Sequence, residues 1–264
     1  MFKVLVADKL APQGLDILRA NGDIEVETAA GLAPAEFVAK IPPFHGLIVR
    51  SGSTVTADVI AAAENLRVIG RAGIGVDNID VAAATARGIV VMNTPSGNNV
   101  TTAEHAISMM LSLARSIPQA TASMKSGLWE KGRFVGSEVF KKTLGVIGLG
   151  NIGRLVAERA IGLKMKVVVY DPFLTADVAS THGVDLVSLD ELYGCSDFIT
   201  IHVPLMAETR GLVGSDAFAK MKKGVRLVNC ARGGIVDEAA LAAALEDGTV
   251  AGAALDVFEQ EPPP

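Results

Sequence analysis

Short apolar stretches recur along the chain, and segments with helical character separate them. In the first hundred residues these stretches are KVLVAD, IEVET, GLIVRS, RVIGRA and GIVVMN, the last of which ends at Asn93. They are almost continuously apolar rather than alternating, which is typical of strands in a parallel sheet that helices cover on both faces. The pattern therefore predicts an α/β fold built from βαβ units.

A second series of the same kind begins at Thr143. It consists of TLGVIGLG, KVVVYD, VDLVSL, DFITIHVP, VRLVNCA and AGAALDVF. Two successive series of this kind predict two doubly wound parallel sheets, each in its own domain. We expect the first domain over residues 1–97 and the second over residues 121–264.

A long helix is predicted between the two series, over Thr101 to Arg115. The stretch TTAEHAISMMLSLAR opens with a threonine that can cap the helix, and Glu104 lies near its first turn. Apolar residues cover most of its circumference, so we expect both domains or a partner subunit to bury it. Residues 98–120 are therefore expected to bridge the domains.

Composition narrows the classes of protein. Half of the residues are hydrophobic, and the net charge of −5 disfavours nucleic acid and anionic membranes as partners. No apolar stretch approaches the roughly 20 residues of a membrane span, and no signal-peptide core is found, so a cytoplasmic location is expected. Cys195 and Cys230 lie among apolar residues, which favours reduced, buried thiols over a disulfide or a metal site.

The strongest chemical signal is the glycine pattern GLGNIG after the apolar run Leu144 to Ile147. Gly148, Gly150 and Gly153 have the G-x-G-x-x-G spacing and precede a helical segment. The first glycine permits a tight turn, the second lets a pyrophosphate approach the backbone, and the third lets helix and strand pack closely. This context predicts a dinucleotide-binding domain.

The choice of dinucleotide depends on Asp171. It ends the next predicted strand, KVVVYD, 18 residues after Gly153. An acid at about this separation binds the ribose hydroxyls of NAD. Because a carboxylate repels a 2′-phosphate, we predict NAD rather than NADP as the cofactor.

Arg232 marks a second candidate site, directly after the apolar strand in LVNCARGGIVDE. Open α/β sheets bind ligands at the carboxyl ends of their strands. An arginine there can hold a carboxylate in bidentate geometry and polarise a neighbouring carbonyl. From its position alone, a surface arginine that closes a salt bridge is an equally good interpretation.

Several segments together resemble the D-isomer-specific 2-hydroxyacid dehydrogenases. They are, in order, RAGIGVDNID, VMNTPSGN, GLGNIGR, YDPF, HVPL, NCARGGIVDE and ALDVFEQEPP, and the match runs from Lys3 to Pro263. The resemblance implies a flavodoxin-like substrate domain followed by a Rossmann NAD-binding domain. It also favours the functional interpretation of Arg232.

The resemblance assigns roles residue by residue. The catalytic positions match Arg232 and Glu261. The cofactor positions match Ile74, Gly148, Gly150, Asn151, Ile152, Gly153, Asp171, Val203, Pro204, Cys230, Arg232 and Asp256. The substrate positions match Arg50, Ser51, Arg71, Gly73, Gly75, Asn98 and Arg232. Two further arginines beside Arg232 suit a substrate that carries a phosphate as well as a carboxylate, although Arg50 and Arg71 could also be solubilising residues at strand ends.

Hydride transfer to a keto acid also needs a proton donor, for which histidine is the natural choice. The chain has His45, His105, His182 and His202, and we expect the first three to be structural or solvated. In the family the acid–base histidine follows the match to Glu261, in a Pro-His-Leu segment that this sequence lacks, and Glu261 would raise its pKa. We therefore expect a fragment of a longer dehydrogenase whose Rossmann domain lacks its last strand. A substitute role for His202 is the alternative.

Three functions remain open. The first is an NAD-dependent dehydrogenase that acts on a phosphorylated 2-hydroxy or 2-oxo acid, and the second is a hydroxypyruvate or glyoxylate reductase. The third is an NAD(H)-binding protein without turnover. A homodimer is expected, because the segment SGLWEKGRFVGSEV is predicted to expose Trp129 and Phe134 beside charged residues and the family commonly dimerises through this region.

Overall fold

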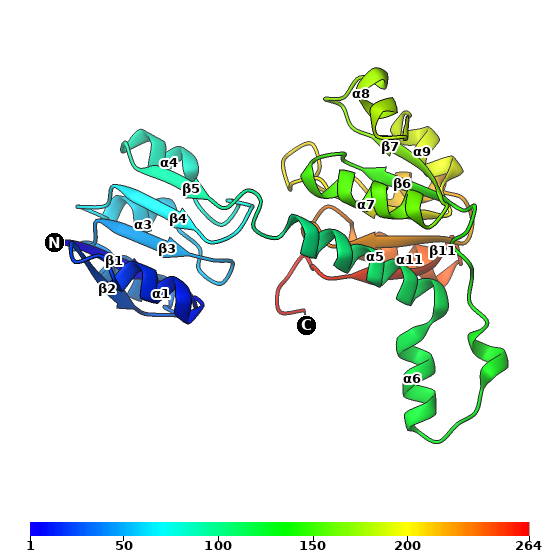
Figure 1. Cartoon of the computed structure of the whole chain (residues 1–264), viewed down its shortest axis with the longest axis horizontal. Coiled ribbons are helices and arrows are strands. Elements are labelled where there is room, and N and C mark those ends of the chain that lie inside the picture. The colour runs from blue at the N-terminus through cyan, green and yellow to red at the C-terminus, as the bar shows by residue number, and fades with distance from the viewer. Residues whose placement is uncertain (264) are drawn as a thin grey trace. The chain divides into compact units, whose positions relative to one another are not determined.

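The computed structural model describes residues 1–263, and the chain forms two compact units, Met1–Asn98 and a second from Asn99 onward (Figure 1). The second domain, which was predicted over residues 121–264, includes Pro264, and this residue lies outside the described residues. Each unit contains one parallel sheet with helices between successive strands. Because strands alternate with helices along the chain and form two parallel sheets, as predicted, the α/β fold class is confirmed.

The first unit holds a five-stranded sheet in the order β2-β1-β3-β4-β5. All its pairings are parallel. This is the flavodoxin-like strand order. The elements, in chain order, are β1 Phe2–Val6, α1 Pro12–Arg19, β2 Ile24–Thr28, α2 Pro34–Lys40, β3 Gly46–Val49, α3 Ala57–Ala62, β4 Val68–Arg71, α4 Val81–Ala86 and β5 Val90–Asn93.

The second unit holds a six-stranded sheet in the order β8-β7-β6-β9-β10-β11, again with parallel pairings. Numbered from β6, this is the order 3-2-1-4-5-6 of dinucleotide-binding folds. The described residues thus include all six strands of that order. The elements are α5 Asn99–Arg115, α6 Ile117–Lys125, a short 3-10 helix at Lys131–Phe134, β6 Thr143–Ile147, α7 Asn151–Gly162, β7 Lys166–Tyr170, α8 Ala176–Thr181, β8 Asp185–Leu186, α9 Leu189–Cys195, β9 Phe198–Ile201, α10 Ser215–Lys220, β10 Val225–Asn229, α11 Glu238–Glu246 and β11 Val250–Leu255.

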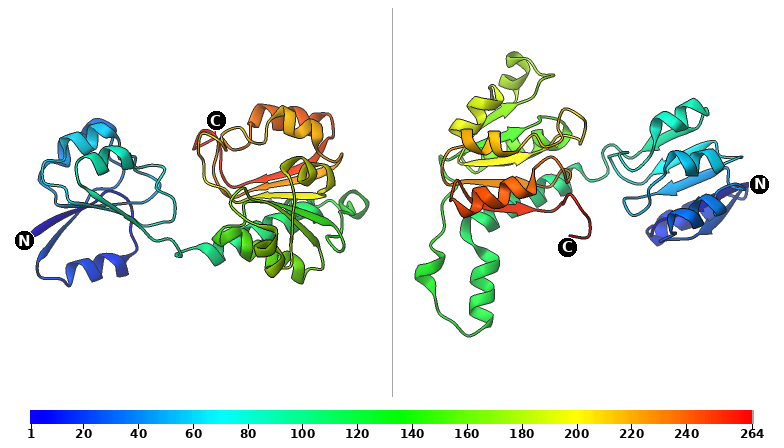
Figure 2. Two further views of the ribbon diagram at one scale, coloured as in Figure 1. Left: turned by 90° about the horizontal axis from the view of Figure 1, so that it is seen from above. Right: turned by 180° about the vertical axis from the view of Figure 1, so that it is seen from behind.

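Helices cover both faces of the second sheet, which Figure 2 shows as three layers. On one face α5 and α7 pack over a core that includes Leu144, Val146 and Phe198. On the other face α9, α10 and α11 cover Ile147, Ile199 and further apolar side chains. Burial on both faces explains why these strands have almost continuously apolar sequences.

Helix α5 is a packing element of the second unit. It lies against α7, β10 and β11, and it buries Ala103, Ala106, Met110 and Ala114. These positions are three or four residues apart and so share one face, and the small alanines let the helix approach the sheet closely. The neighbouring Met109 is partly buried in the same core.

The two cysteines differ in their surroundings. Cys230 is buried, as predicted, but Cys195 is exposed, so the prediction of two buried thiols was wrong. Cys195 is the last residue of α9, whose inner face is formed by Leu192 and Tyr193. Its apolar neighbours in sequence therefore occupy the core, while the helix end turns the thiol outward.

The described residues contain neither a helix that could span a membrane nor a cluster of side chains that could bind a metal ion. Within residues 1–263 no helix is long and apolar enough to span a membrane. The same residues contain no cluster of three or more histidine, cysteine or acidic side chains that could bind a metal ion.

Candidate functional site

The carboxyl edge of the second sheet collects the predicted cofactor residues. Because all strands are parallel, their carboxyl ends lie at this edge, and backbone hydrogen bonds of 2.8–3.0 Å continue past the strands at Gly148, His202 and Asp256. In spatial order the edge carries Asp256 after β11, Cys230 and Arg232 after β10, Val203 and Pro204 after β9, the glycine loop after β6, and Asp171 after β7. The loops after β6 and β9 flank the point where the strand order reverses, which is where such sheets bind ligands.

The three glycines of the loop are required for different reasons. Gly148 has φ +92°, and a Cβ there would lie 2.8 Å from the carbonyl oxygen of His202. A Cβ at Gly153 would lie 2.0 Å from the carbonyl oxygen of Gly148, so only glycine lets α7 approach β6 this closely. A Cβ at Gly150 would meet nothing within 4 Å. Gly150 therefore borders open space, whereas Gly148 and Gly153 are needed for packing.

The amino-terminal end of α7 fits a dinucleotide pyrophosphate. Gly150 is the N-cap residue and makes no side-chain capping bond, so the first N–H groups of the helix, at Asn151, Ile152 and Gly153, have no side-chain cap. Such N–H groups bind phosphate oxygens, and the helix dipole favours their negative charge. The side chain of Asn151 is exposed. The residues present thus fit the cofactor that the sequence predicts.

Asp171 is tied to the same loop. Its Oδ2 atom accepts a hydrogen bond of 2.9 Å from the backbone N–H of Leu149, and its Oδ1 atom accepts one of 2.9 Å from the N–H of Phe173. The carboxylate therefore fixes the glycine loop against the end of β7. The glycine pattern and the acid were predicted from their spacing in sequence, and the structure shows a direct hydrogen bond between them.

Replacing Asp171 by alanine is expected to weaken NAD binding about tenfold or more and to reduce the preference for NAD over NADP. The change removes a charged acceptor, worth about 1.5–3 kcal/mol, and it frees the loop. Isothermal titration with NAD and NADP measures both effects. Asp177→Ala, at an exposed acid on the nearby α8, is the control. Unchanged affinities for both dinucleotides in Asp171→Ala would contradict the assignment of the ribose-binding acid.

His202 follows β9 and does not have the properties of a proton donor. Its Nε2 atom lies 2.9 Å from Oγ1 of Thr200, and its backbone N–H bonds the carbonyl of Ile147 at 2.8 Å. Burial lowers the pKa of His202 to about 4. The imidazole is therefore neutral near pH 7 and engaged inside the fold, which argues against a substitute acid–base role.

This histidine should make the protein less stable in weak acid. The unfolded side chain binds a proton below its ordinary pKa of 6.5, whereas the folded one does so only near 4, so stability is present above pH 6.5 and is lost as the pH falls towards 4. Between pH 7 and pH 5 we expect wild type to lose about 2 kcal/mol more than His202→Gln. Urea unfolding at both pH values measures this. His182→Gln, at an exposed histidine, should behave like wild type. Equal losses in wild type and His202→Gln would show that burial does not restrain protonation.

The loop after β10 presents Arg232. The buried Asn229 side chain accepts a hydrogen bond from the N–H of Ala231 and donates one to the carbonyl of Arg232, both at 3.0 Å. Arg232 is partly buried, and its Nη1 atom donates to the carbonyl of Ala231 at 2.6 Å. A Cβ at Gly233 would lie 1.8 Å from the carbonyl oxygen of Phe258. The Arg232 loop therefore packs directly against the segment that carries Glu261.

Cys230 is an inert side chain at this edge. Burial, with a smaller contribution from the charge of Asp256, raises the pKa of its thiol to about 12. Its Sγ atom lies 3.4 Å from Sδ of Met109. A thiol that remains protonated and contacts a thioether is suited to lining the site rather than to nucleophilic chemistry.

The segment after β11 brings together acidic residues and one histidine. Asp256 Oδ1 lies 3.4 Å from Nε2 of His105 on α5, and both side chains are about half exposed. Glu261 accepts a hydrogen bond of 3.1 Å from the N–H of Phe258. Sequence reasoning did not connect His105 with this edge, because the pair forms only when α5 packs across β11.

The predicted substrate residues of the first unit lie at the ends of two neighbouring strands. Arg50 and Ser51 follow β3, and Arg71 ends β4 beside it. The Arg71 guanidinium lies so close to Gly73 that a Cβ there would be 1.6 Å from Nη1. Glycine at this position is therefore necessary for the arginine to take this place.

The other residues predicted in the first unit lie in the segments that follow β4 and β5. Ile74 and Gly75 follow in the same loop and are partly buried, and the carbonyl of Ile74 accepts a hydrogen bond of 2.6 Å from Nδ2 of Asn93. Asn98 is exposed just before α5. The structure brings Arg50, Ser51, Arg71 and Gly73 to one edge, whereas Asn98 lies in the final loop of the unit.

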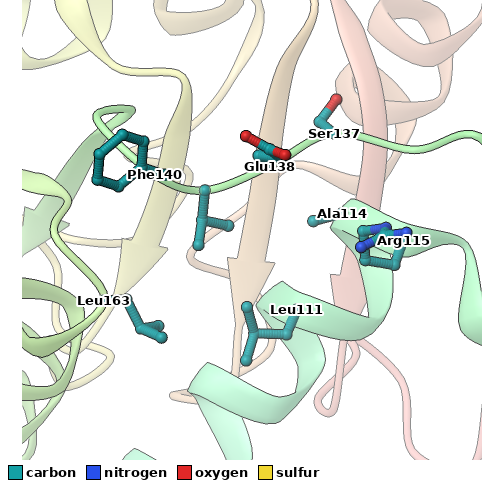
Figure 3. Close-up of a pocket in the computed structure, with 8 residues that line it drawn as sticks. Leu111, Ala114, Arg115, Ser137, Glu138, Phe140 and Leu163 are labelled. Atoms are coloured by element: carbon teal, nitrogen blue, oxygen red, sulfur yellow. The ribbon is translucent and has the colours of Figure 1, made fainter.

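A separate pocket of about 390 Å³ lies at the opposite end of β6 (Figure 3). It lies between the last turn of α5, the segment before β6 and the residue after α7. Its lining is Leu111, Ala114, Arg115, Ser137, Glu138, Val139, Phe140 and Leu163. Because α7 runs back from the glycine loop to Leu163, this pocket is not part of the edge that carries the predicted cofactor residues.

Comparison with known families agrees with this geometry. Residues 107–264 match a sequence model described as the NAD-binding domain of the D-isomer specific 2-hydroxyacid dehydrogenases. The NAD cofactor predicted from the glycine loop and Asp171 agrees with that description.

Individual relatives extend the likeness to the first unit. The D-3-phosphoglycerate dehydrogenase of Archaeoglobus fulgidus is 54% identical over 261 residues, which are 99% of this chain and 49% of that protein. The chain spans about half the length of the curated relatives it matches.

Two solved structures resemble the whole fold. A Thermus thermophilus protein has a TM-score of 0.92 and 35% identity, covering 100% of this chain and 84% of that one. A glyoxylate reductase from Paecilomyes thermophila has a TM-score of 0.90 and 31% identity, covering 99% of this chain and 83% of that one.

Proposed function

Because the chain belongs to the D-isomer-specific 2-hydroxyacid dehydrogenase family, we propose that the complete protein oxidises 3-phospho-D-glycerate to 3-phosphohydroxypyruvate with NAD, a step of serine biosynthesis. The observation that carries the proposal is the pair Arg50 and Arg71, which lie at the carboxyl ends of the neighbouring strands β3 and β4. A substrate with both a phosphate and a carboxylate needs more than one cationic side chain. The 54% identity with a D-3-phosphoglycerate dehydrogenase supports the same substrate.

The two units then have separate tasks. We propose that the first, predicted over residues 1–97, binds the substrate, and that the second binds the cofactor, with 98–120 linking them. Gly150 would leave room for the pyrophosphate, the first N–H groups of α7 would bind it, and Asp171 would bind the ribose. When bound, NAD supplies a hydride acceptor.

The residues proposed for chemistry are Arg232 and Glu261. Arg232, held by the Asn229 side chain, would bind the carboxylate and polarise the carbonyl of the keto acid. Glu261 would accept a hydrogen bond from the acid–base histidine of a complete dehydrogenase and hold it in position. The close packing of Gly233 against Phe258 would hold the loop of Arg232 and the segment of Glu261 in a fixed position relative to each other.

The test is an absorbance assay of NADH oxidation with 3-phosphohydroxypyruvate, hydroxypyruvate and glyoxylate. We expect turnover with a strong preference for the phosphorylated acid in a chain extended to the length of the curated relatives. The chain of residues 1–264 is assayed beside it, and the comparison shows how much activity this shorter chain retains. If neither chain consumes NADH with any of the three acids, the enzyme assignment is wrong, and an NAD(H)-binding protein is the better interpretation.

A glyoxylate or hydroxypyruvate reductase is the second candidate. The structural likeness to a glyoxylate reductase favours it, since that protein shares the fold at a TM-score of 0.90. The same assay separates the candidates, because a reductase of this type would prefer the two unphosphorylated acids.

We also propose that the protein is a homodimer. Figure 1 shows α6 and the following segment projecting from the sheet of the second unit. This projecting arm exposes the large apolar side chains of Ile117, Met124, Leu128, Trp129, Val135 and Phe140. Phe134, which was predicted to be exposed, is partly buried instead. An apolar patch of this kind is typical of a protein interface, and sedimentation equilibrium tests it. A cytoplasmic location stays a prediction from the sequence.

A further inference from the structure

The Arg50–Ser53 turn, which follows β3, is fixed by two side chains from elsewhere in the first unit. Oδ2 of Asp8 accepts hydrogen bonds from the N–H of Arg50 at 2.5 Å and of Ser53 at 3.2 Å. Nδ2 of Asn78 donates to the carbonyl oxygens of the same two residues, each at 2.6 Å. Both ends of the turn are therefore held through both of their backbone polar groups.

Further contacts restrict the turn between these ends. Oγ of Ser53 donates to the carbonyl of Ala7 at 3.0 Å, and Nη1 of Arg50 donates to the carbonyl of Lys9 at 3.3 Å. A Cβ at Gly52 would lie 2.6 Å from Oδ1 of Asp8. The carboxylate of Asp8 thus lies against the turn at Arg50, Gly52 and Ser53, and the turn can lie this close to it only because residue 52 is glycine.

The middle of the turn is left open for a ligand. Ser51 and Gly52 are exposed, and within the part of the chain that the structure describes their N–H groups donate no hydrogen bond. Successive unoccupied N–H groups next to an arginine make a binding place for an anion. Asp8 and Asn78 hold the turn in the conformation that offers this combination.

We propose that Asp8 and Asn78 are positioning residues that shape the Arg50–Ser53 turn for the phosphate group of the substrate. The inference rests on the proposed function, because it takes a phosphorylated acid as the ligand. Neither residue need contact the ligand: Asp8 acts through the N–H groups of Arg50 and Ser53, and Asn78 acts through their carbonyls.

The negative charge of Asp8 has two opposing effects on an anion. It repels a nearby phosphate, but it also holds the turn in one conformation before the ligand arrives. We expect the second effect to dominate, because the carboxylate is already engaged by two N–H groups and water screens its remaining field. The sign of the change in Asp8→Asn therefore decides between the two effects.

The experiment is isothermal titration of 3-phospho-D-glycerate, and separately of D-glycerate, into the chain saturated with NAD. Asp8→Asn should lower the affinity for 3-phospho-D-glycerate at least tenfold and the affinity for D-glycerate less than twofold, with the affinity for NAD unchanged. Asp16→Asn, at an exposed acid on α1, should match wild type. Asn78→Ser, which removes the bonds to the two carbonyls, should repeat the selective loss and serves if Asp8→Asn does not fold.

Three results would overturn the inference. Equal or tighter binding of 3-phospho-D-glycerate by Asp8→Asn would show that repulsion dominates or that the turn needs no support. Equal losses for both acids would show a general structural role. If wild type itself does not bind 3-phospho-D-glycerate, the proposed function fails, and this inference fails with it. In the first two cases wild type binds the acid, so the proposed function stands.

Discussion

Gly153→Ala is expected to abolish measurable NAD binding and to lower the free energy of unfolding by roughly 3 kcal/mol. The added methyl group would lie 2.0 Å from the carbonyl oxygen of Gly148 and 3.1 Å from its carbonyl carbon. Because these are backbone atoms, no side-chain rotation can relieve the clash, and α7 must move away from β6. The glycine loop and its bond to Asp171 would move with it. Titration with NAD and urea unfolding measure the two effects.

Two matched variants separate folding from binding. Gly162→Ala lies at the other end of the same helix, where a Cβ meets nothing within 4 Å, and it should bind NAD like wild type. Gly150→Ala also meets no protein atom, so it should fold normally, but its methyl group would occupy the space proposed for the pyrophosphate. If Gly150→Ala bound NAD as tightly as wild type, the loop would not be the cofactor site.

The strands and the glycine loop could be predicted from the sequence because local rules determine them. A continuous apolar run such as KVVVY has one stable place in a parallel sheet, and the spacing of Gly148, Gly150 and Gly153 is set by the turn between β6 and α7. Asp171 follows from the same unit, since β7 must pair with β6. These features need only the order of elements in one βαβ unit.

Contacts between distant segments were not predictable in the same way. Asp8 and Arg50 are 42 residues apart, and His105 on α5 and Asp256 after β11 lie at opposite ends of the second unit's sequence. Each contact depends on which strands become neighbours and on how far each loop extends beyond its strand. An aspartate after an apolar run is common, so its neighbours in sequence alone give Asp8 no particular role.

Cys195 shows the same limit for burial. Its sequence neighbours include Leu192 and Tyr193, which are buried, yet the thiol is exposed because α9 ends at that residue. Apolar neighbours predict an apolar element, but the position of a residue on the helix decides whether it faces the core. For Arg232, conversely, the position after a buried strand was enough to predict that it lies at the carboxyl edge of the sheet, because the ends of parallel strands lie at one edge.

Gly233→Ala should cause the second large effect, at the contact between the Arg232 loop and the Phe258 segment. The added Cβ would lie 1.8 Å from the carbonyl oxygen of Phe258 and 2.3 Å from its carbonyl carbon. Since these are backbone atoms, the two segments must separate. We expect the free energy of unfolding to fall by about 3 kcal/mol. Hydrogen exchange should become faster at the N–H of Phe258, which bonds Glu261, and at that of Glu259, which bonds the Glu238 side chain.

The consequence for function is specific to the proposed chemistry. Separation of the segments would change the position of Glu261 relative to Arg232, so binding of a keto acid should weaken more than binding of NAD, whose loop lies across β9 at β6. Gly132→Ala, where a Cβ meets nothing within 4 Å, is the control and should change neither stability nor exchange. If Gly233→Ala keeps wild-type stability and wild-type exchange at Phe258 and Glu259, the two segments do not pack as the structure shows. Arg232 and Glu261 would then be positioned independently, and the shared site proposed for them would lose its main structural support.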